Sequence, residues 1–198
     1  LMSLPHLLNT RLETIPATNP YLFADQERVQ AWGERVSTDQ FKVGICWQGK
    51  KAKADLGRSF PLSLFEGISR IPNVELISLH KGEGEAQLAG IDFDVTTLGH
   101  DFDAGQDAFL DTAAVMMNCN LIITSDTSVA HLAGAIGRPT WVVLKQTPDW
   151  RWMLDRPDSP WYPTMTLYRQ ESRGDWVDVF ETIERDLRSL LQQKKEVQ

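Results

Sequence analysis

The sequence has little of several things that would assign a class of protein at once. Among 198 residues there are only two cysteines and four histidines, and their spacing contains no zinc-binding pattern. No apolar run is long enough to span a bilayer as a helix. Basic residues are in deficit, 20 against 27 acidic ones, and the net charge of −7 argues against a nucleic-acid partner. A local cluster of cations still leaves room for a small anionic ligand.

The start of the chain and its cysteines indicate a compartment. The opening LMSLPHLL lacks the basic segment and the small-residue cleavage site of a signal peptide. Cys46 and Cys119 each lie in an apolar run, so we expect two buried free thiols. Both features favour the cytoplasm, where thiols stay reduced. Leu1 precedes Met2, and we expect residues 1–24 to be a junction from a missing N-terminal part.

Residues 25–198 are long enough for one domain with a sizeable core. Strands that are apolar along their whole length alternate with helical patterns. This alternation predicts an α/β fold, a Rossmann-like parallel sheet with helices on both faces. The predicted strands are 41–47, 74–79, 94–98, 121–124, 140–144 and 165–168, and the predicted helices are 25–36, 62–69, 108–117, 125–136 and 175–191.

No Gly-x-Gly-x-x-Gly pattern follows the first predicted strand, so the ordinary dinucleotide fingerprint is missing. Ligands of open parallel sheets nevertheless bind at the carboxyl ends of the strands. Four of these ends carry glycines, hydroxyls and cations, which is typical of a diphosphate pocket. The cationic candidates are Lys50 and Arg58 after the first strand and Lys81 after the second. A solvated loop is the simpler interpretation of any single lysine, whereas Arg58 adjoins Ser59, the expected cap of the next helix.

The segment LIITSDTSVAHLAGAIGRP runs from a strand directly into a helix. Ser125 or Asp126 is the expected N-cap, which leaves backbone N–H groups near Thr127 and Ser128 available to an anion. His131 follows one helical turn later. The alternative is that Asp126 and Thr127 only cap the helix and that His131 only packs. The pattern leaves both interpretations open.

A tryptophan-rich stretch follows the strand predicted at 140–144. Its aromatic side chains form either a stacking platform for a base or sugar, or an apolar cluster that fastens a long loop to the domain. The pattern favours the second interpretation for most of them. The residues concerned are Trp150, Trp152, Trp161 and Tyr162.

Two sets of residues resemble known families. The run SDTSVAHLAGAIGRP resembles the Asp-Thr/Ser-x-x-x-His segment of family 9, heptosyltransferase-like glycosyltransferases. The stretches PDWRWMLDRPDSPWYP, MSLPHLL and RSFPLSLF resemble the glycosyltransferase-like domain at the C-terminus of bacterial tetratricopeptide-repeat proteins. The resemblance implies the C-terminal, donor-binding half of a GT-B glycosyltransferase, with a nucleoside-diphosphate sugar as substrate and with no metal or cofactor.

The same resemblance implies roles for individual residues. Asp126, Thr127 and Ser128 would hold the donor phosphates, His131 would shape that site, and Lys50 or Arg58 would approach the diphosphate. The catalytic base would lie on a missing N-terminal half, so the expected partners are that half and tetratricopeptide repeats. The isolated chain is then expected to bind a donor without turnover. Two alternatives stay open: a catalytically inactive binding or interaction module, and a sugar-nucleotide epimerase of GT-B type.

Overall fold

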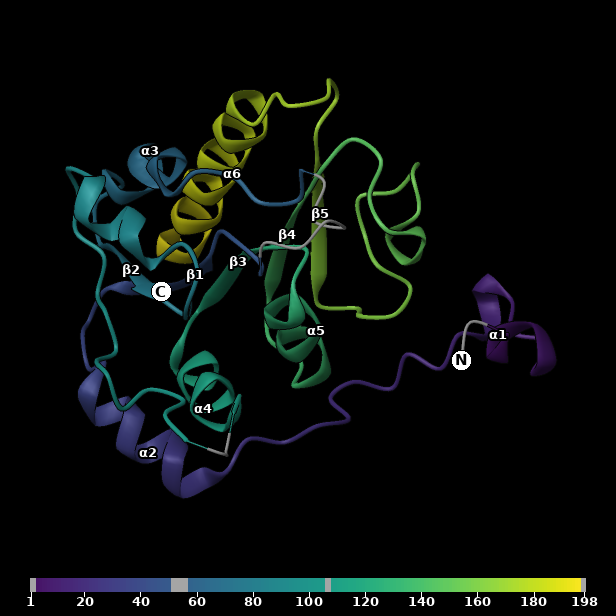
Figure 1. The fold of residues 1–198 in the computed structure, drawn as a ribbon, viewed down its shortest axis with the longest axis horizontal. Helices are drawn as coiled ribbons and strands as arrows, with labels where there is room; N and C mark the ends of the chain where they lie inside the picture. Colours follow the sequence, from purple (N-terminus) through teal and green to yellow (C-terminus); the bar gives the residue numbers. More distant parts are fainter. Residues whose placement is uncertain (1–2, 51–56, 106–107, 197–198) are drawn as a thin grey trace.

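The computed structural model describes residues 3–50, 57–105 and 108–196 of the chain. Its centre is a five-stranded parallel sheet in the order β2-β1-β3-β4-β5 (Figure 1). All four strand pairings are parallel, as the apolar strands predicted. The strands are β1 Phe41–Cys46, β2 Val74–Ser78, β3 Leu121–Ser125, β4 Thr140–Leu144 and β5 Met165–Arg169.

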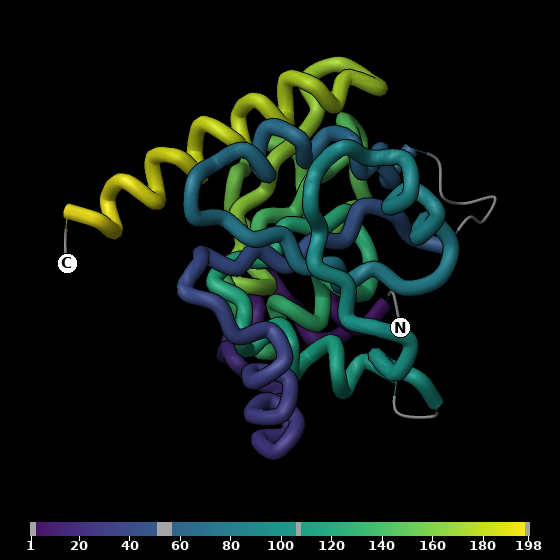
Figure 2. Tube along the Cα trace, turned by 90° about the vertical axis from the view of Figure 1, so that its left-hand side faces the viewer, coloured from purple at the N-terminus to yellow at the C-terminus, as the bar shows by residue number. Residues whose placement is uncertain are grey.

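Helices cover both faces of this sheet. In Figure 1, α3 and α6 lie over one face, and α2, α4 and α5 lie over the other. Figure 2 shows the last turns of α6 reaching beyond the rest of the chain. Among the described residues no helix is both long and apolar enough to cross a membrane. The helices are α1 Leu4–Leu7, α2 Gln26–Arg35, α3 Glu66–Ser69, α4 Leu110–Asn118, α5 Ser128–Ala135 and α6 Val177–Glu196, with short 3-10 turns η1 Leu12–Thr14, η2 Leu62–Phe65, η3 Glu85–Gly90 and η4 Trp150–Trp152.

The face under α3 and α6 is packed with phenylalanine rings. Phe65 meets Phe180 of α6 edge to face at 5.0 Å between ring centroids, and Phe60 meets the same ring at 5.1 Å. All three side chains are buried. Burial of such rings contributes roughly 1.5–3 kcal/mol each, so this cluster is a main reason why α6 stays on the sheet.

On the opposite face of the sheet, one buried carboxylate joins helices α2 and α4. Asp111 of α4 accepts hydrogen bonds from Arg28 at 2.7 Å and from Trp32 Nε1 at 3.0 Å, both on α2. It also accepts from the backbone N–H of Asp103 at 3.0 Å. A buried charge needs such partners, and this set fixes α2 against α4.

The segment before α2 runs away from the sheet in Figure 1, and α1 lies at its far end. Its last part docks on the C-terminal end of α5. The backbone N–H groups of Tyr21 and Leu22 both donate to the carbonyl of Ala135, at 2.9 and 3.1 Å. Asn19 donates to the carbonyl of Gly134. A domain boundary at residue 24 remains a prediction.

Three local predictions are wrong. The strand expected at 94–98 is a single bridge between Thr96 and Ile77. The helix expected over 62–69 starts as the 3-10 turn η2 after Pro61, and Ser59 accepts a hydrogen bond from the N–H of Gly49 at 3.3 Å instead of capping it. The helix expected from residue 125 begins at Ser128.

Candidate functional site

The order of strands reverses between β1 and β3, because the chain goes from β1 outward to β2 and then returns to the other side of β1. Such a switch point is where open α/β sheets bind ligands. A hollow of about 250 Å³ lies there, and the loops after β1, β2 and β3 all contribute to it. We call it the switch-point hollow. Its lining includes Gln48, Gly49, Lys50, His80, Lys81, Thr127 and Ser128.

The N-terminus of α5 forms one wall. Thr127 is the N-cap residue, with extended backbone angles of φ −133° and ψ 177°, and its side chain makes no capping hydrogen bond. Its Oγ1 turns toward the strand ends, 3.4 Å from Thr124 Oγ1 and 4.0 Å from Cys46 Sγ. The first-turn N–H groups of α5 therefore donate no hydrogen bond to the cap side chain. This helix end is suited to an anion.

The expected capping by Ser125 or Asp126 is thus wrong. Ser125 is the last residue of β3, fully buried and paired with Val143 of β4, so its backbone belongs to the sheet. Asp126 makes the turn between strand and helix. It lines neither the switch-point hollow nor the larger hollow described below.

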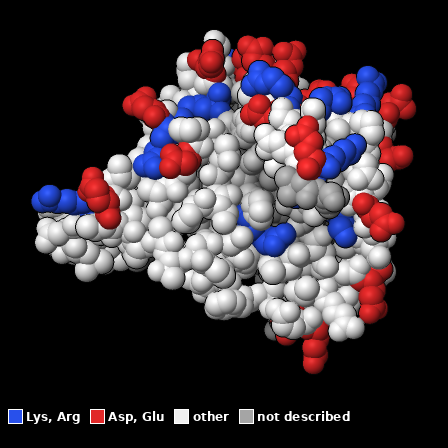
Figure 3. All heavy atoms as spheres, turned by 180° about the vertical axis from the view of Figure 1, so that it is seen from behind, with Lys and Arg blue, Asp and Glu red and all other residues white. Residues whose placement is uncertain are grey.

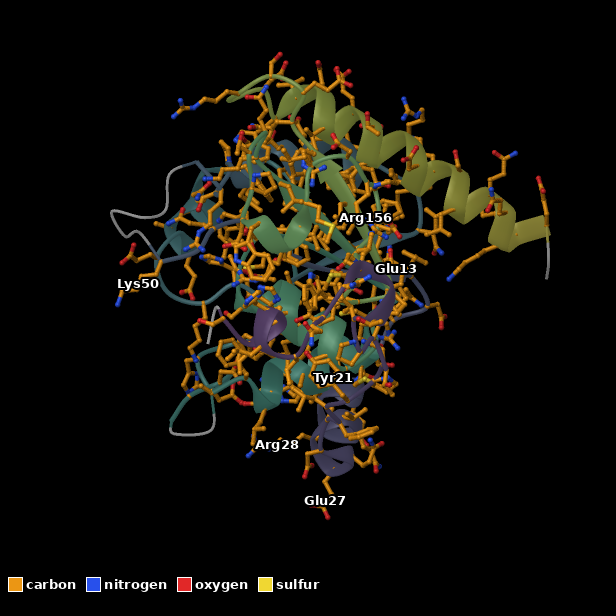
Figure 4. All side chains as sticks on the ribbon, turned by 90° about the vertical axis from the view of Figure 1, so that its right-hand side faces the viewer. Glu13, Tyr21, Glu27, Arg28, Lys50 and Arg156 are labelled. Atoms are coloured by element: carbon orange, nitrogen blue, oxygen red, sulfur yellow. The ribbon has the colours of Figure 1, made fainter. Side chains whose placement is uncertain are left out.

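The loop after β1 brings a cation to this helix end. A Cβ on Gly49 would lie 3.3 Å from Thr127 Cγ2 and 3.4 Å from Arg58 Nη2, so both side chains approach the space that this glycine leaves open. Lys50 is exposed at the rim of the hollow and projects outward in Figure 4. Lys51 and Lys53 lie outside the described residues.

Lys81, after β2, lies on the opposite wall. Its ammonium donates to the carbonyl of Phe102 and lies 5.8 Å from the centroid of that ring. The lysine is exposed and lines both the switch-point hollow and a neighbouring hollow, and Phe102 belongs to the neighbouring one. The structure brings together Lys50, Lys81, Thr127 and Ser128, with Arg58 beside them.

Sequence reasoning did not predict the contact between a buried histidine, His80, and a buried cysteine, Cys46, in the lining of the switch-point hollow. The ring of His80 stacks on Trp47 at 4.2 Å, and its Nε2 lies 2.6 Å from the carbonyl oxygen of Glu83. Because a carbonyl only accepts, Nε2 donates, and Nδ1 is left to accept from the Cys46 thiol at 3.6 Å. Burial raises the pKa of Cys46 to about 11, so the thiol stays protonated and is no thiolate nucleophile.

His131 lies elsewhere. Its ring stacks on Trp152 with centroids 5.2 Å apart, and its Nδ1 is 3.1 Å from the hydroxyl of Tyr162. It lines a second hollow of about 560 Å³ instead of the switch-point hollow. The sequence spacing placed Thr127 and His131 in one site, whereas in the structure they line two different hollows.

Burial lowers the pKa of both His80 and His131 below the ordinary value of a histidine. In the unfolded chain each would titrate near pH 6.5, at about the free value. Below that pH the unfolded chain binds more protons than the folded chain does. The stability that comes from keeping these two histidines neutral is therefore fully present above that pH, and it is lost as the pH falls through the lower pKa values of the folded state. We expect the midpoint of thermal unfolding to fall between pH 7 and pH 5.

The His80→Gln variant should show a shallower fall over the same range, whereas the exposed His6→Gln variant should behave as the parent chain does. Thermal melts followed by circular dichroism at several pH values provide the measurement. A midpoint that rises on acidification would contradict a neutral buried His80.

Both cysteines are free and buried, as predicted. Within the described parts of the chain, no group of three or more His, Cys, Asp or Glu side chains could hold a metal ion. Figure 3 shows the charged side chains of one face gathered mainly toward its margins, with much of its centre uncharged. The candidate site contains the N-terminus of α5 and two lysines that line the switch-point hollow, with Arg58 beside it.

Comparison with known proteins agrees with this architecture. The chain matches no protein-family profile. It is 30% identical over 182 residues to Protein FlbA of Caulobacter vibrioides, across 87% of this chain and 29% of that protein. Its fold is similar to that of E. coli ADP-heptose LPS heptosyltransferase II, with a TM-score of 0.63 at 15% identity over 91% of this chain.

A second solved structure, a family 9 glycosyl transferase from Veillonella parvula, aligns with a TM-score of 0.62 at 14% identity over 92% of this chain. The chain covers 56% and 58% of these two structures, so it spans little more than half of their length. The chain therefore has a glycosyltransferase-like α/β fold, as predicted.

Proposed function

We propose that this chain is the donor-binding half of a glycosyltransferase and that the switch-point hollow holds the diphosphate of a nucleotide sugar. The observation that carries the proposal is the N-terminus of α5, which has no side-chain cap and borders a hollow with lysines on two other walls. A helix end and nearby cations are the elements that bind phosphate groups. The fold shared with family 9 glycosyltransferase structures supports the same assignment.

The chemistry follows from where charge develops. An acceptor hydroxyl attacks the anomeric carbon, and the nucleoside diphosphate leaves with the bonding electrons. The N–H groups of Ser128 and its neighbours, together with Lys50 and Arg58, stabilise the negative charge that builds on the leaving group. Removal of one such fixed donor typically costs about 2–4 kcal/mol of barrier. We assign the base that deprotonates the acceptor to a second, N-terminal half.

A ligand screen tests the proposal directly. The chain is melted in the presence of UDP, GDP, ADP and CMP, their sugar conjugates and the matching nucleosides. A ligand at one hundred times its dissociation constant adds about 2.7 kcal/mol of stability, which shifts the melting temperature by several degrees. A diphosphate should stabilise more than the matching nucleoside. Equal effects of nucleoside and diphosphate would contradict a phosphate site at α5.

Lys50→Gln is expected to weaken binding of the selected diphosphate roughly three- to tenfold, because an exposed cation close to phosphate contributes only modest Coulomb energy in water. The loss should shrink as salt is raised, because screening weakens the interaction in the parent chain. Isothermal titration calorimetry at two salt concentrations measures both effects. Lys195→Gln, at the far end of α6, is the matched control and should bind as the parent chain does.

A further inference from the structure

The second hollow is lined mostly by aromatic side chains. It has a volume of about 560 Å³. Two of its aromatic residues are unusually exposed: Tyr21 at 53% and Trp150 at 50%. Tyr21, labelled in Figure 4, and Pro16 come from the N-terminal segment, and the other residues come from α5 and the long loop after β4. We call it the aromatic hollow, formed by Tyr21, His131, Trp150, Arg151, Trp161 and Tyr162.

The aromatic rings are fixed in place. Trp161 Nε1 donates to the carbonyl of Arg151 at 3.0 Å. Tyr162 packs so closely on α5 that a Cβ on Gly134 would lie 2.5 Å from its ring. Trp152, beneath His131, is fully buried. The expectation that the tryptophan-rich stretch fastens the loop therefore holds for Trp152, whereas Trp150 remains half exposed in the wall of a hollow.

The two outer indoles form a corner. The ring planes of Trp150 and Trp161 are 87° apart, with centroids separated by 6.1 Å. A flat nucleobase stacks best between parallel plates, which this arrangement does not offer. A puckered ring with C–H groups on its faces and edges can contact both indoles at once, so the shape favours a sugar ring over a base.

The charge of the wall points to an uncharged ligand. Arg151 forms an ion pair with Asp149 at 3.1 Å, which offsets its charge. Burial lowers the pKa of His131, so its imidazole is neutral at pH 7. The remaining polar groups are hydroxyls and ring nitrogens. Such groups suit a neutral ligand rich in hydroxyls.

The polar groups form a hydrogen-bonded chain. Tyr162 Oη lies 3.1 Å from His131 Nδ1 and 3.5 Å from Tyr21 Oη. If the Tyr162 hydroxyl donates to Nδ1, then Nε2 of the neutral imidazole carries the proton. The hollow then presents the Nε2–H group of His131 as a donor and the tyrosine hydroxyl oxygens as acceptors, both next to aromatic rings.

We propose that the aromatic hollow binds an uncharged pyranose ring, as a saccharide subsite beside the switch-point hollow. The inference deepens the proposed function and rests on it for the role of the sugar. The first turn of α5 lines one hollow and His131, one turn later, lines the other, so the same helix adjoins both. The sugar is either that of the donor or that of the acceptor.

The indole N–H signals of the seven tryptophans report on the binding directly in two-dimensional NMR of the nitrogen-15-labelled chain. Methyl glucopyranoside, mannopyranoside and galactopyranoside are titrated into the millimolar range. At least one should shift the Trp150 and Trp161 signals and leave that of Trp32, which lies between α2 and α4, in place. Trp150→Ala should weaken this binding roughly three- to tenfold, as loss of a stacking partner does.

The matched control is Leu154→Ala, an exposed side chain on the same loop that does not line the hollow. It should bind the glycoside as the parent chain does. Absence of any shift at Trp150 with all three glycosides would overturn the inference. So would a stronger response to a nucleoside or a methyl glucuronide, or undiminished binding by Trp150→Ala.

The source of the sugar follows from two further titrations. A shift at Trp150 with a nucleotide sugar but not with its nucleotide identifies the donor sugar, whereas a shift with free glycoside while the nucleotide sugar is bound identifies the acceptor.

The same titrations distinguish failure of the proposed function from failure of this inference. Glycoside binding without any nucleotide binding would contradict the proposed function alone, and nucleotide binding with no shift of the Trp150 signal by any glycoside would contradict this inference alone.

Discussion

Replacement of Phe65 by Ala should lower the free energy of unfolding by about 3–5 kcal/mol, the usual cost of a fully buried aromatic side chain. Phe65 has no exposed surface and sits at the end of η2, just before α3. Its ring contacts Phe180 edge to face at 79° and also packs near Phe60, 6.1 Å away. The substitution removes these contacts and leaves a cavity between α3, α6 and the sheet.

Urea unfolding followed by circular dichroism measures the loss. Phe23→Ala is the matched control, because it deletes the same atoms from a side chain that is 82% exposed. A surface change of this kind usually alters stability by less than about 0.5 kcal/mol. If both variants lost the same free energy, or if Phe65→Ala lost less than about 1 kcal/mol, this face of the sheet would not be packed as described.

The fold could be predicted from the sequence because the strands of a parallel sheet are buried on both faces and are therefore apolar along their length. Runs such as FKVGIC and LIITS are apolar almost throughout, and both became central strands, β1 and β3. The run at 94–98 failed for a related reason. It contributes two ladder hydrogen bonds, both through Thr96 next to β2, and three of its five residues, Asp94, Thr96 and Thr97, are polar, so no further strand forms at this edge.

The candidate site was readable only in part, because tertiary contacts decide the start of α5. Continued pairing of β3 with β4 keeps Ser125 in the sheet, and this moves the cap to Thr127. The extended backbone of Thr127 then breaks the helical phase, so its spacing of four from His131 does not place both on one face. The prediction from spacing treated Thr127 as helical, whereas the chain enters α5 only at Ser128.

The contact between Cys46 and His80 had no local signal at all. The two residues are 34 positions apart, and only the parallel register of β1 with β2 brings the ends of these strands together. A histidine directly after one apolar strand and a cysteine at the end of another were the available hints. Pairing of those two strands was needed to connect them.

The other large effect is expected at the first residue of α5. Ser128→Pro should weaken binding of a nucleoside diphosphate roughly ten- to a hundredfold, the loss expected when a hydrogen bond to a charged group is removed. Proline has no N–H, so the change deletes one backbone donor from the helix end that faces the hollow. It should leave the helix intact, because proline is favoured at the first helical position and the extended Thr127 is compatible with a following proline.

Ser128→Ala is the matched control, because it removes the hydroxyl but keeps the backbone donor. Calorimetric titration of both variants separates the two groups: the alanine variant should bind within about threefold of the parent chain, and the proline variant should not. Equal melting temperatures would show that the helix is unharmed. If the proline variant bound as tightly as the alanine variant, the N–H of Ser128 would make no contact with phosphate. If the alanine variant lost as much as the proline variant, the hydroxyl would be the ligand. The comparison thus tests whether the anion is held by the backbone of α5, which is the part of the site that this fold supplies without any particular side chain.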